Sequence, residues 1–271
     1  GSLVYTNVTE HVKIGDAPAD FQRLAPSFTV SLQPWQEQLL FLRLMYKSTF
    51  RMPTFNDLYY YRLGNRSLRP EKANEYNMGI TWSRSFSSFL NYLSVTVDGY
   101  YNDVTDKIVA FPTTYAWKMA NYGKVHVTGM DATLAAAASL GKNTVLVVSG
   151  GYTWQKAIDL TDATSKSYKD QLPYTPKHSG NVSAVLEMPW VNVGYSIVGV
   201  SERYSMSQNI PENRIDGYME HTVSLSRNFS FRHCKLRLQA EIINLTDTQY
   251  DVIKYYPMPG RSWRLTGTIE F

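Results

Sequence analysis

The sequence predicts an all-β protein and, within that class, an antiparallel transmembrane β-barrel. Three observations carry this prediction. Apolar and polar side chains alternate over long segments, short and long connections alternate along the chain, and tyrosine is in excess, with 20 copies among 271 residues. Soluble strands usually have about five or six residues, whereas tilted strands that cross a membrane need about nine to eleven. The alternating segments of this chain are mostly of the longer kind.

The composition excludes several other classes of protein. Apolar residues make up 44% of the chain and charged residues 18%, which is not the composition of a disordered protein. No stretch approaches the roughly 18 uninterrupted apolar residues of a spanning helix. The net charge is only +4 and the basic residues form no long run, so we expect no nucleic-acid partner. Cys234 is the single cysteine, which excludes an internal disulfide.

The last segment of the chain shows the alternation most clearly. Trp263, Leu265, Ile269 and Phe271 share one face, and the residues between them, such as Arg264, share the other. The same pattern predicts about twelve strands, near residues 2–6, 27–33, 38–50, 73–83, 89–111, 117–138, 144–157, 178–188, 191–203, 217–229, 232–244 and 262–271.

The connections between these strands alternate in length. The short ones are residues 33–36, 84–88, 140–143, 189–190 and 230–231, and the long ones are 7–26, 51–72, 158–177, 204–216 and 245–261. The link near 112–116 is the exception on the long side. Outer-membrane barrels have short periplasmic turns and longer extracellular loops. We therefore expect the long loops outside the cell, with one short helical turn at Phe55–Tyr59.

The alternation also assigns the faces of the barrel, because a charge facing lipid near the midplane costs roughly 2–4 kcal/mol. We expect Arg237, Glu241 and Arg264 to face the lumen, and Leu236, Leu238, Leu265 and Ile269 to face lipid. Aromatic girdles at the two interfaces would explain the tyrosine excess. They are expected to include Trp35, Trp190, Phe229 and Phe231 on the short-turn side, and Tyr100, Tyr101, Tyr152, Trp154 and Tyr204 toward the long loops.

No motif for catalysis is found in the sequence. The histidines form no metal-binding spacing, and His178 and His221 are expected to be structural or lumen-facing. Asp159 and Asp162 share a long loop and could together contact Ca²⁺, but the lysines around them favour a solvated loop. We therefore expect no enzyme activity, no cofactor and no metal site.

Several stretches of the sequence resemble one known family. The first follows residue 49 and reads FRMPTFNDLYY, then GN, LRPE and EYNMG. The second reads YYNDVTDKI at 100–108, and NYG follows at 121–123 with GMD at 129–131. The third is the C-terminal block, which begins with NLTD, contains YPMPGR and ends in the final strand. Together they resemble TonB-dependent outer-membrane receptors from about residue 46 onward, although Asp131 stands where glutamate is commoner in the family.

The resemblance implies an architecture and a set of partners. Members of the family begin with a plug domain and a TonB box, followed by a barrel of about 22 strands. Neither plug nor box is found here, so residues 1–271 are expected to be the C-terminal part of such a barrel, in the outer membrane of a Gram-negative, Bacteroidetes-like bacterium. The implied partners are the N-terminal plug and barrel strands, the TonB complex acting through the plug, and outer-membrane lipid. A surface lipoprotein is a further option.

The resemblance also implies active import of a scarce, bulky nutrient such as cobalamin, a ferric siderophore or haem. Substrate contacts are expected from loop residues that can stack or form hydrogen bonds, namely Tyr59, Tyr60, Tyr61, Arg62, Arg203, Tyr204, Arg214, Tyr255 and Tyr256. The final strand, through Trp263, Leu265, Ile269 and Phe271, resembles the signal read by the barrel-assembly machinery. Two alternatives remain, a passive outer-membrane pore and a soluble β-sandwich that binds carbohydrate.

Overall fold

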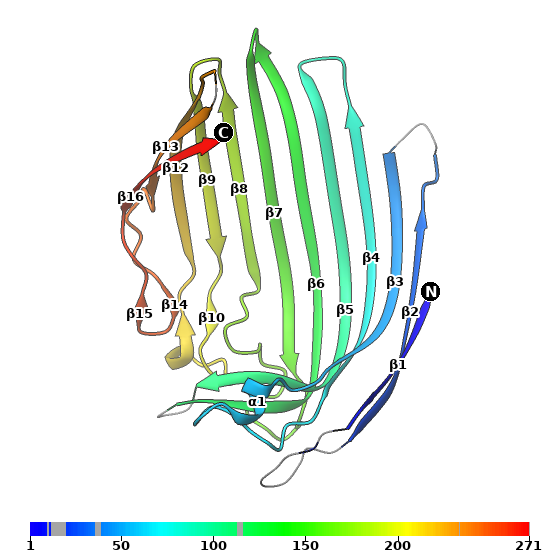
Figure 1. Ribbon diagram of the computed structural model, residues 1–271. Coiled ribbons are helices and arrows are strands. Elements are labelled where there is room, and N and C mark those ends of the chain that lie inside the picture. The colour runs from blue at the N-terminus through cyan, green and yellow to red at the C-terminus, as the bar shows by residue number, and fades with distance from the viewer. Residues whose placement is uncertain (10, 12–19, 36–38, 113–115, 233, 271) are drawn as a thin grey trace.

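A computed structural model describes residues 1–271 apart from residues 10, 12–19, 36–38, 113–115, 233 and 271 (Figure 1). Twelve strands form one sheet, in the order β1-β2-β3-β4-β5-β6-β7-β8-β9-β12-β13-β16. These strands are β1 (Ser2–Val8), β2 (Phe21–Leu32), β3 (Leu39–Arg51), β4 (Glu71–Ser85), β5 (Leu90–Pro112), β6 (Trp117–Gly141), β7 (Thr144–Asp159), β8 (His178–Glu187), β9 (Asn192–Val200), β12 (Tyr218–Ser230), β13 (Lys235–Ile243) and β16 (Ser262–Glu270).

Every pair of neighbouring strands in this sheet is antiparallel. The sheet is strongly curved and open, with β1 and β16 at its two edges (Figure 1). A single curved sheet is a wall of a barrel, so the prediction of a barrel-type all-β fold is confirmed and the β-sandwich alternative, which needs two packed sheets, is wrong.

The strand boundaries agree with the predicted ones to within a few residues, except at β2. This strand begins at Phe21, six residues before the predicted start at residue 27, and Phe21 pairs with Val8 of β1. The predicted long connection extended to residue 26, so its C-terminal part is wrong. Pro26 cannot donate to a strand ladder. It lies in the part of β2 that pairs with β1, beyond the register with β3, which starts at Ser27.

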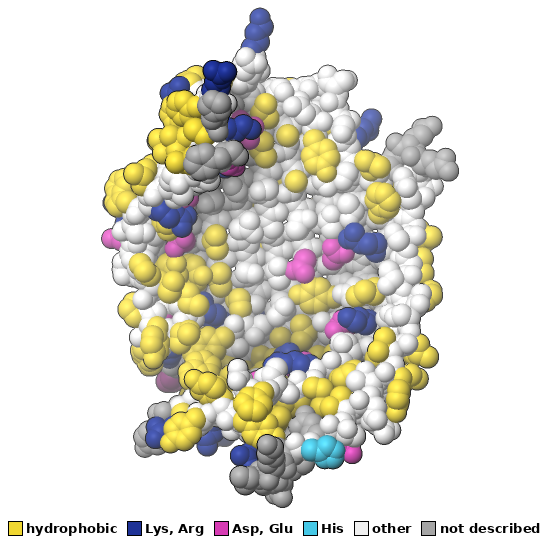
Figure 2. Space-filling model, viewed as in Figure 1, with side chains coloured by type: hydrophobic (Ala, Val, Ile, Leu, Met, Phe, Trp, Pro, Cys, Tyr) yellow, Lys and Arg dark blue, Asp and Glu magenta, His cyan; other side chains and the backbone are white. Residues whose placement is uncertain are grey.

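The register sorts the side chains onto two faces. Arg43, Gly79, Asp98, Asp131 and Thr153 lie opposite one another on successive strands. Arg43 Nη2 contacts Asp98 Oδ1 at 3.0 Å, and Thr153 Oγ1 donates to Asp131 Oδ1 at 2.6 Å. Charged and polar side chains are seen in the hollow of the sheet (Figure 2). This row therefore belongs to the concave face, which in a closed barrel is the lumen.

The alternate residues of the same strands form the convex outer face, which is apolar. Its exposed residues include Leu44, Met78, Ile80, Leu134, Val182 and Leu225. At the C-terminal end the predicted faces are confirmed, since Glu241 pairs with Arg264 in an ion pair of 2.5 Å while Leu238, Leu265 and Ile269 are exposed on the other face. Trp263 is on that outer face too, and Phe271 lies outside the described residues.

Two glycines on the concave face make room for larger side chains of the neighbouring strand. A Cβ on Gly79 would lie 1.9 Å from Asp98 Oδ1, and a Cβ on Gly129 would lie 2.4 Å from the Tyr100 ring. Tyr100 crosses over Gly129, and its hydroxyl donates to Gln155 at 3.1 Å. Tyr100 therefore faces inward, and its predicted place in the outer girdle beside Tyr101 is wrong. Consecutive strand residues point to opposite faces.

The outer face carries a belt of aromatic pairs toward the loop end. Tyr46 and Tyr76 pair across β3 and β4, with ring centroids 5.1 Å apart. The next three pairs join a tyrosine to a histidine, namely Tyr101 with His126, Tyr152 with His178 and Tyr195 with His221. The predicted structural role of His178 and His221 is thus confirmed, but both face outward and not into the lumen.

Candidate functional site

The long connections gather at one end of the sheet, at the bottom of Figure 1, and form a folded rim around it. The rim contains α1 (Phe55–Tyr59), a 3₁₀ turn at Pro211–Asn213 and two small hairpins. These hairpins are β10 (Arg203–Tyr204) with β11 (Arg214–Ile215), and β14 (Asp251–Ile253) with β15 (Tyr256–Pro257). No helix in the described part of the chain is long and apolar enough to cross a membrane.

The helix α1 begins where the sequence supplies a cap. Thr54 accepts a hydrogen bond from the Asp57 backbone N–H at 3.2 Å, and the Asp57 carboxylate accepts one from the Thr54 N–H at 2.9 Å. Arg51, the last residue of β3, contacts the same carboxylate through its Nη2 at 2.9 Å. Such a reciprocal cap satisfies the free N–H groups of the first turn. Leu58 packs inward with Leu68, Ile108 and Met119, which fixes the helix on the end of the β5–β6 ribbon.

The link near 112–116 was the one short connection on the long-loop side, and the structure explains why. β5 and β6 continue as a paired ribbon beyond their neighbours, up to the pair Pro112 and Trp117, and in Figure 1 the ribbon turns across the end of the sheet. Within the ribbon Asp106 has a φ of 54° and forms no pair in the ladder, while Thr105 with Lys124 and Lys107 with Tyr122 keep the same register on either side of it. The ribbon itself takes the place of a long loop.

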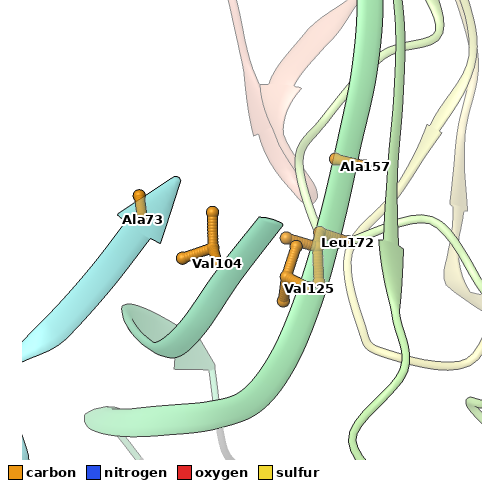
Figure 3. Close-up of a cluster of buried hydrophobic side chains, with 5 residues drawn as sticks. All are labelled: Ala73, Val104, Val125, Ala157 and Leu172. Carbon is orange, nitrogen blue, oxygen red and sulfur yellow. The ribbon is translucent and has the colours of Figure 1, made fainter. Parts of the chain in front are cut away.

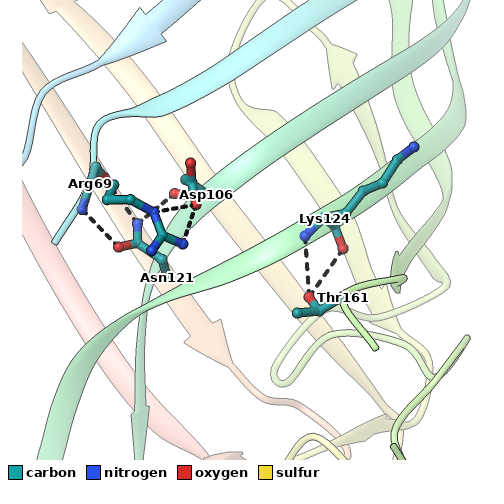
Figure 4. A network of polar contacts seen from close by, with 5 residues as sticks. All are labelled: Arg69, Asp106, Asn121, Lys124 and Thr161. Carbon is teal, nitrogen blue, oxygen red and sulfur yellow. Dashed lines mark hydrogen bonds and ion pairs between the residues drawn. The ribbon is translucent and has the colours of Figure 1, made fainter. Parts of the chain in front are cut away.

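Asn121 ties the loop after α1 to the ribbon at Asp106 (Figure 4). Its Oδ1 accepts from the Arg69 N–H at 2.8 Å, and its Nδ2 donates to the Arg69 carbonyl at 3.0 Å and to the Asp106 carbonyl at 2.6 Å. The Arg69 guanidinium completes the clamp by donating to Asp106 Oδ1. This carboxylate raises the pKa of Arg69 above its ordinary value, chiefly through that hydrogen bond.

The loop between β7 and β8 is fixed by a buried amide. Gln171 is 3% exposed and donates to the carbonyls of Gln155 at 3.3 Å and Thr175 at 3.2 Å, while its Oε1 accepts from the Ala157 N–H at 3.2 Å. The next residue, Leu172, enters a cluster with Ala73, Val104, Val125 and Ala157 (Figure 3). The loop therefore lies on the concave side of β4 to β7, since these four residues belong to the concave rows.

The predicted Ca²⁺ alternative in the same loop has its carboxylates engaged in turns. Asp159 accepts from the Thr161 N–H at 2.9 Å and from Ser167 Oγ at 3.3 Å. Asp162 accepts from the Thr164 N–H and hydroxyl, which lower the pKa of Asp162. Among the described residues no group of three or more histidine, cysteine, aspartate or glutamate side chains could hold a metal ion.

The loop between β9 and β12 docks onto the loop just described. Asn209 Oδ1 accepts from the Gln171 N–H at 2.8 Å, and Asn209 Nδ2 donates to the Gln171 carbonyl at 3.0 Å. Ser207 lies 2.6 Å from the Tyr122 hydroxyl on β6. The Tyr174 N–H donates to the Tyr204 carbonyl at 2.7 Å. The rim is thus a connected layer and not a set of independent loops.

Arg203 is the centre of the last part of the rim. It is 5% exposed, lies over the Tyr218 ring at 5.8 Å and donates from Nη2 to the carbonyls of Asp251 and Val252. Tyr218 stacks on Tyr250 at 3.9 Å, and the Tyr250 hydroxyl donates to Glu220 at 2.6 Å. Burial of the phenol, followed by the charge and hydrogen bond of Glu220, raises the pKa of Tyr250 above its ordinary value.

The loop that carries β14 and β15 is held at its base by a second buried amide. Asn244 is 1% exposed, accepts from the Thr248 N–H at 2.9 Å and donates to the Thr248 and Pro259 carbonyls. Beside this loop lies a concavity of about 320 Å³, whose lining includes Arg214, Asp216, Tyr250, Lys254 and Tyr255. The lining combines the cations of Arg214 and Lys254 with two phenols and with the carboxylates of Asp216 and Asp251, and Arg214 is paired with Asp216 at 3.0 Å. Such a surface can stack against a planar group and form hydrogen bonds with a polar one.

The predicted substrate residues fall into two groups. The first contains Tyr59, Tyr60, Tyr61 and Arg62 beside α1, and the second contains Arg203, Tyr204, Arg214, Tyr255 and Tyr256. Tyr60, Tyr61, Tyr255 and Tyr256 are 59%, 79%, 82% and 70% exposed. Tyr59 is part of the packing around α1 and lies under Arg66, and Arg203 is buried. Tyr59 and Arg203 therefore belong to the packing of the rim, whereas the other four rings are open to solvent.

The two groups are joined through the start of β6. The Met119 N–H donates to the Leu63 carbonyl at 3.0 Å. The Trp117 ring lies 5.8 Å from the Tyr174 ring, and the Tyr174 N–H donates to the Tyr204 carbonyl. Sequence reasoning placed Tyr174, Tyr250 and Lys254 in the predicted long loops and Trp117 in a predicted strand, but it named none of the four as a site residue. The resemblance covers the motif that contains Tyr250, so that residue could have been found, whereas no local pattern distinguishes the other three.

Comparison with known proteins places the chain in a family. Residues 4–245 match the family described as TonB dependent receptor-like, beta-barrel. The chain is 26% identical to a vitamin B12 transporter BtuB of Photobacterium profundum over 82% of this chain and 34% of that protein. A second vitamin B12 transporter BtuB, from Vibrio vulnificus, is 24% identical over 82% of this chain and 33% of its own length. The chain thus spans about a third of these curated relatives.

Solved structures show the same fold. The ferric citrate transporter FecA in its unliganded form superposes with a TM-score of 0.71 at 15% identity, over 92% of this chain and 38% of that one. The siderophore receptor PiuA from Acinetobacter baumannii superposes with a TM-score of 0.68 at 18% identity, over 95% of this chain and 38% of that one. The apolar convex face, the charged concave face, the folded rim and the match over residues 4–245 have one explanation: the chain belongs to the TonB-dependent receptor β-barrel family of Gram-negative outer membranes.

Proposed function

We propose that residues 1–271 are the C-terminal part of a 22-stranded receptor barrel, and that the whole receptor imports a scarce, bulky nutrient by a TonB-dependent mechanism. The family is one of transporters and receptors, and we propose no catalytic activity for this chain. The two unpaired sheet edges at β1 and β16 support the proposal, because a membrane offers no hydrogen-bond partner to an open strand. Those edges would pair with the remaining barrel strands, and a plug that contacts the TonB complex would fill the hollow.

The nutrient we favour is cobalamin, with a ferric siderophore as the second candidate and haem as the third. The two curated relatives named above are vitamin B12 transporters, and the structural neighbours named with them carry ferric citrate or siderophores. The observation that carries the proposal is the folded rim, because it presents exposed tyrosines beside the cations of a 320 Å³ concavity. A large ligand with aromatic or amide groups would meet both kinds of side chain.

Within the rim, we propose that Tyr60, Tyr61, Arg62, Arg214, Tyr255 and Tyr256 contact the nutrient, and that Tyr59, Arg203 and Tyr204 position the loops that carry them. Lys254 joins the first set, because it lines the concavity and its ammonium donates to the Glu212 carbonyl. We also propose that a surface lipoprotein, if the receptor has one, covers the same rim from outside the cell.

The experiment is a titration of the full-length receptor, purified from outer membranes in detergent, with cobalamin, a ferric siderophore and haem in turn. One ligand should bind, and the double substitution Tyr255→Ala and Tyr256→Ala should weaken its binding about tenfold or more, as expected for exposed aromatic contacts. Trp190→Ala is the matched control, since this tryptophan is 62% exposed on the short-turn side, far from the rim. Binding of none of the three ligands would exclude the proposed substrate class.

The passive-pore alternative is tested on the same receptor. The complete receptor should show no ion conductance in planar bilayers, because the plug would fill the hollow of the barrel. Uptake of the bound nutrient in cells should stop when TonB is deleted. Open conductance together with uptake that survives the loss of TonB would favour the passive pore.

A further inference from the structure

The outer face contains a groove that the transport proposal does not use. It has a volume of about 460 Å³, and its lining is almost entirely apolar. Phe28, Leu44, Met78 and Tyr101 are among the residues that form its walls, and Gly99 forms part of its floor. A Cβ placed on Gly99 would come no closer than 4.0 Å to a neighbouring atom, so the groove is open above this residue. We call it the Gly99 groove.

Directly beyond the groove, toward the rim, the outer face becomes basic. The strand registers place three outward rows side by side, with Tyr76, Tyr101, Thr128 and Lys156 in the row nearest the groove, then Asn74, Asp103 and His126, and then Lys72, Thr105 and Lys124. Neighbouring strands are about 4.8 Å apart, so Lys72 and Lys124 emerge about 10 Å apart, on either side of Thr105. We call Lys72, Lys124, His126 and Lys156 the basic band.

The charges of the basic band are not balanced on the surface that carries them. Asp103 is the one carboxylate in the three rows, and it lies 4.0 Å from Lys124 Nζ and 3.2 Å from His126 Nε2. Lys72 and Lys156 are exposed, and none of the ion pairs found in the described part of the chain includes either of them. The band therefore offers an excess of positive charge to whatever lies outside the barrel.

The position of the basic band on the outer face indicates which kind of molecule lies against it. Tyr46, Tyr76 and Tyr101 form tilted ring pairs in succession across β3, β4 and β5 at the level where the apolar face ends, which is where interfacial aromatics sit in a membrane. Lys156 lies in the row of Tyr76 and Tyr101, whereas His126 lies one row and Lys72 and Lys124 lie two rows further out, at headgroup level. A ligand of the lumen cannot reach the basic band, because the side chains point away from the hollow. A lipid can reach it, because the apolar groove and the cations lie one above the other on the same face.

We propose that this face binds one diphosphorylated, acylated lipid of the outer leaflet, with an acyl chain in the Gly99 groove, one phosphate between Lys72 and Lys124, and the other phosphate beside Lys156. An ammonium cluster stabilises a phosphate by charge-assisted hydrogen bonds, and an acyl chain gains from the apolar lining of the groove. His126, held by Asp103 and by the Tyr101 hydroxyl at 3.3 Å, positions the edge of the phosphate site. The site is independent of the nutrient that the receptor imports.

The test uses the full-length receptor, delipidated in detergent and examined by native mass spectrometry. The probes are a diphosphorylated, multiply acylated glycolipid of the lipid A type, the same lipid without its phosphates, and inorganic phosphate. The diphosphorylated lipid should bind as a single copy, and the dephosphorylated lipid about tenfold or more weakly, since each lysine near an anionic lipid surface contributes measurably. Inorganic phosphate in excess should not displace the lipid, because it cannot occupy the groove.

Two variants separate the parts of the site. The triple substitution Lys72→Gln, Lys124→Gln and Lys156→Gln should weaken binding of the diphosphorylated lipid about tenfold or more. Gly99→Leu should weaken both lipids by filling the groove. The matched control is Lys142→Gln, Lys166→Gln and Lys169→Gln, which removes the same charge from exposed lysines in a turn and a loop. This control should bind lipid like the parent protein, and all variants should show the heat-modifiable migration of a folded barrel.

Three results would overturn the proposal. They are equal binding of the two lipids, unchanged binding after the triple lysine substitution in a folded protein, and displacement of the lipid by inorganic phosphate, which would assign a site for a free anion. If the triple variant does not fold, Lys72→Gln alone decides, because Lys72 is exposed and should still lower the affinity. Loss of nutrient uptake with lipid binding intact would contradict only the transport proposal.

Discussion

The wall of the barrel and its extracellular rim are built from different interactions. The wall is held by strand ladders, and its side chains obey a strict alternation of faces across twelve strands. The rim is held by single polar side chains that reach backbone groups far away in the sequence, as Asn121 does with Arg69 and Asn209 does with Gln171. In the wall, many equivalent strand contacts surround each residue, so one substitution removes a small part of the stabilising free energy. In the rim, one amide holds several backbone groups, so its loss releases all of them. The two regions should therefore respond differently to substitution.

The largest effect is expected in the wall, on its outer face. Val97→Lys places a charge among Ile80, Met78 and Val95, where the cost is about 2–4 kcal/mol at mid-membrane. The abundance of folded receptor in outer membranes should fall strongly, as measured by heat-modifiable migration. Thr96→Lys is the matched control, because Thr96 lies on the concave face beside Thr81. Equal loss from both variants would mean that the faces are assigned wrongly.

The next effect is expected in the rim, at Asn121. Asn121→Ala removes hydrogen bonds to Arg69 and Asp106 and should destabilise the clamp by about 0.5–1.5 kcal/mol for each bond lost, since these backbone groups are exposed or only partly buried. Hydrogen exchange of residues 60–70 should accelerate while the strands below stay protected. Asn121→Asp keeps the acceptor for the Arg69 N–H and loses the donors. Hydrogen exchange of residues 60–70 in this variant should therefore lie between that of the parent protein and that of Asn121→Ala. Acceleration throughout the wall would contradict a separate rim.

The pH dependence of rim stability at Tyr250 gives a further test of the difference between the wall and the rim. The raised pKa of Tyr250 means that the folded rim holds the phenolic proton more tightly than the unfolded chain does. Its contribution to stability is therefore complete below the unfolded pKa of about 10 and is lost as the pH rises beyond it. Protease resistance of the loop 245–261 should fall above about pH 10 in the parent receptor. Tyr250→Phe should reduce this alkaline loss, and an identical pH profile in the two proteins would count against the assignment.

The smallest effect is expected for Arg264→Ala. Its ion pair with Glu241 lies on the concave face, where the arginine side chain is 59% exposed and the glutamate side chain 10%, and pairs that are open to solvent through one partner contribute about 0–1 kcal/mol. The midpoint of thermal unfolding of the full-length receptor should shift little. Glu241→Gln should behave in the same way. A large shift in either variant would show that this pair is shielded from water in the assembled receptor, for instance by the plug.

The fold of the wall could be predicted because a strand has a side-chain period of two. Leu265 and Arg264 were assigned to opposite faces from the alternation alone, and the register of β13 with β16 places them so. The error at Tyr100 came from grouping it with Tyr101 by residue type. The parity of the strand, and Gly129 opposite it, would have placed Tyr100 inward. The start of β2 at Phe21 was missed because the strand was predicted only from residue 27, whereas residues 21–26 pair with β1 alone.

The sequence by itself determined the class of fold, the two faces of the wall and the family, because each depends on local periodicity or on short motifs. Only the tertiary structure decided which loop residues meet. Gln171 and Asn209 are 38 residues apart, and Tyr122 and Ser207 are 85 apart, with no repeating pattern between them. Loop side chains are selected by the geometry of particular backbone groups that fold beside them. That geometry exists only after the strands have brought the loops to the same end of the sheet.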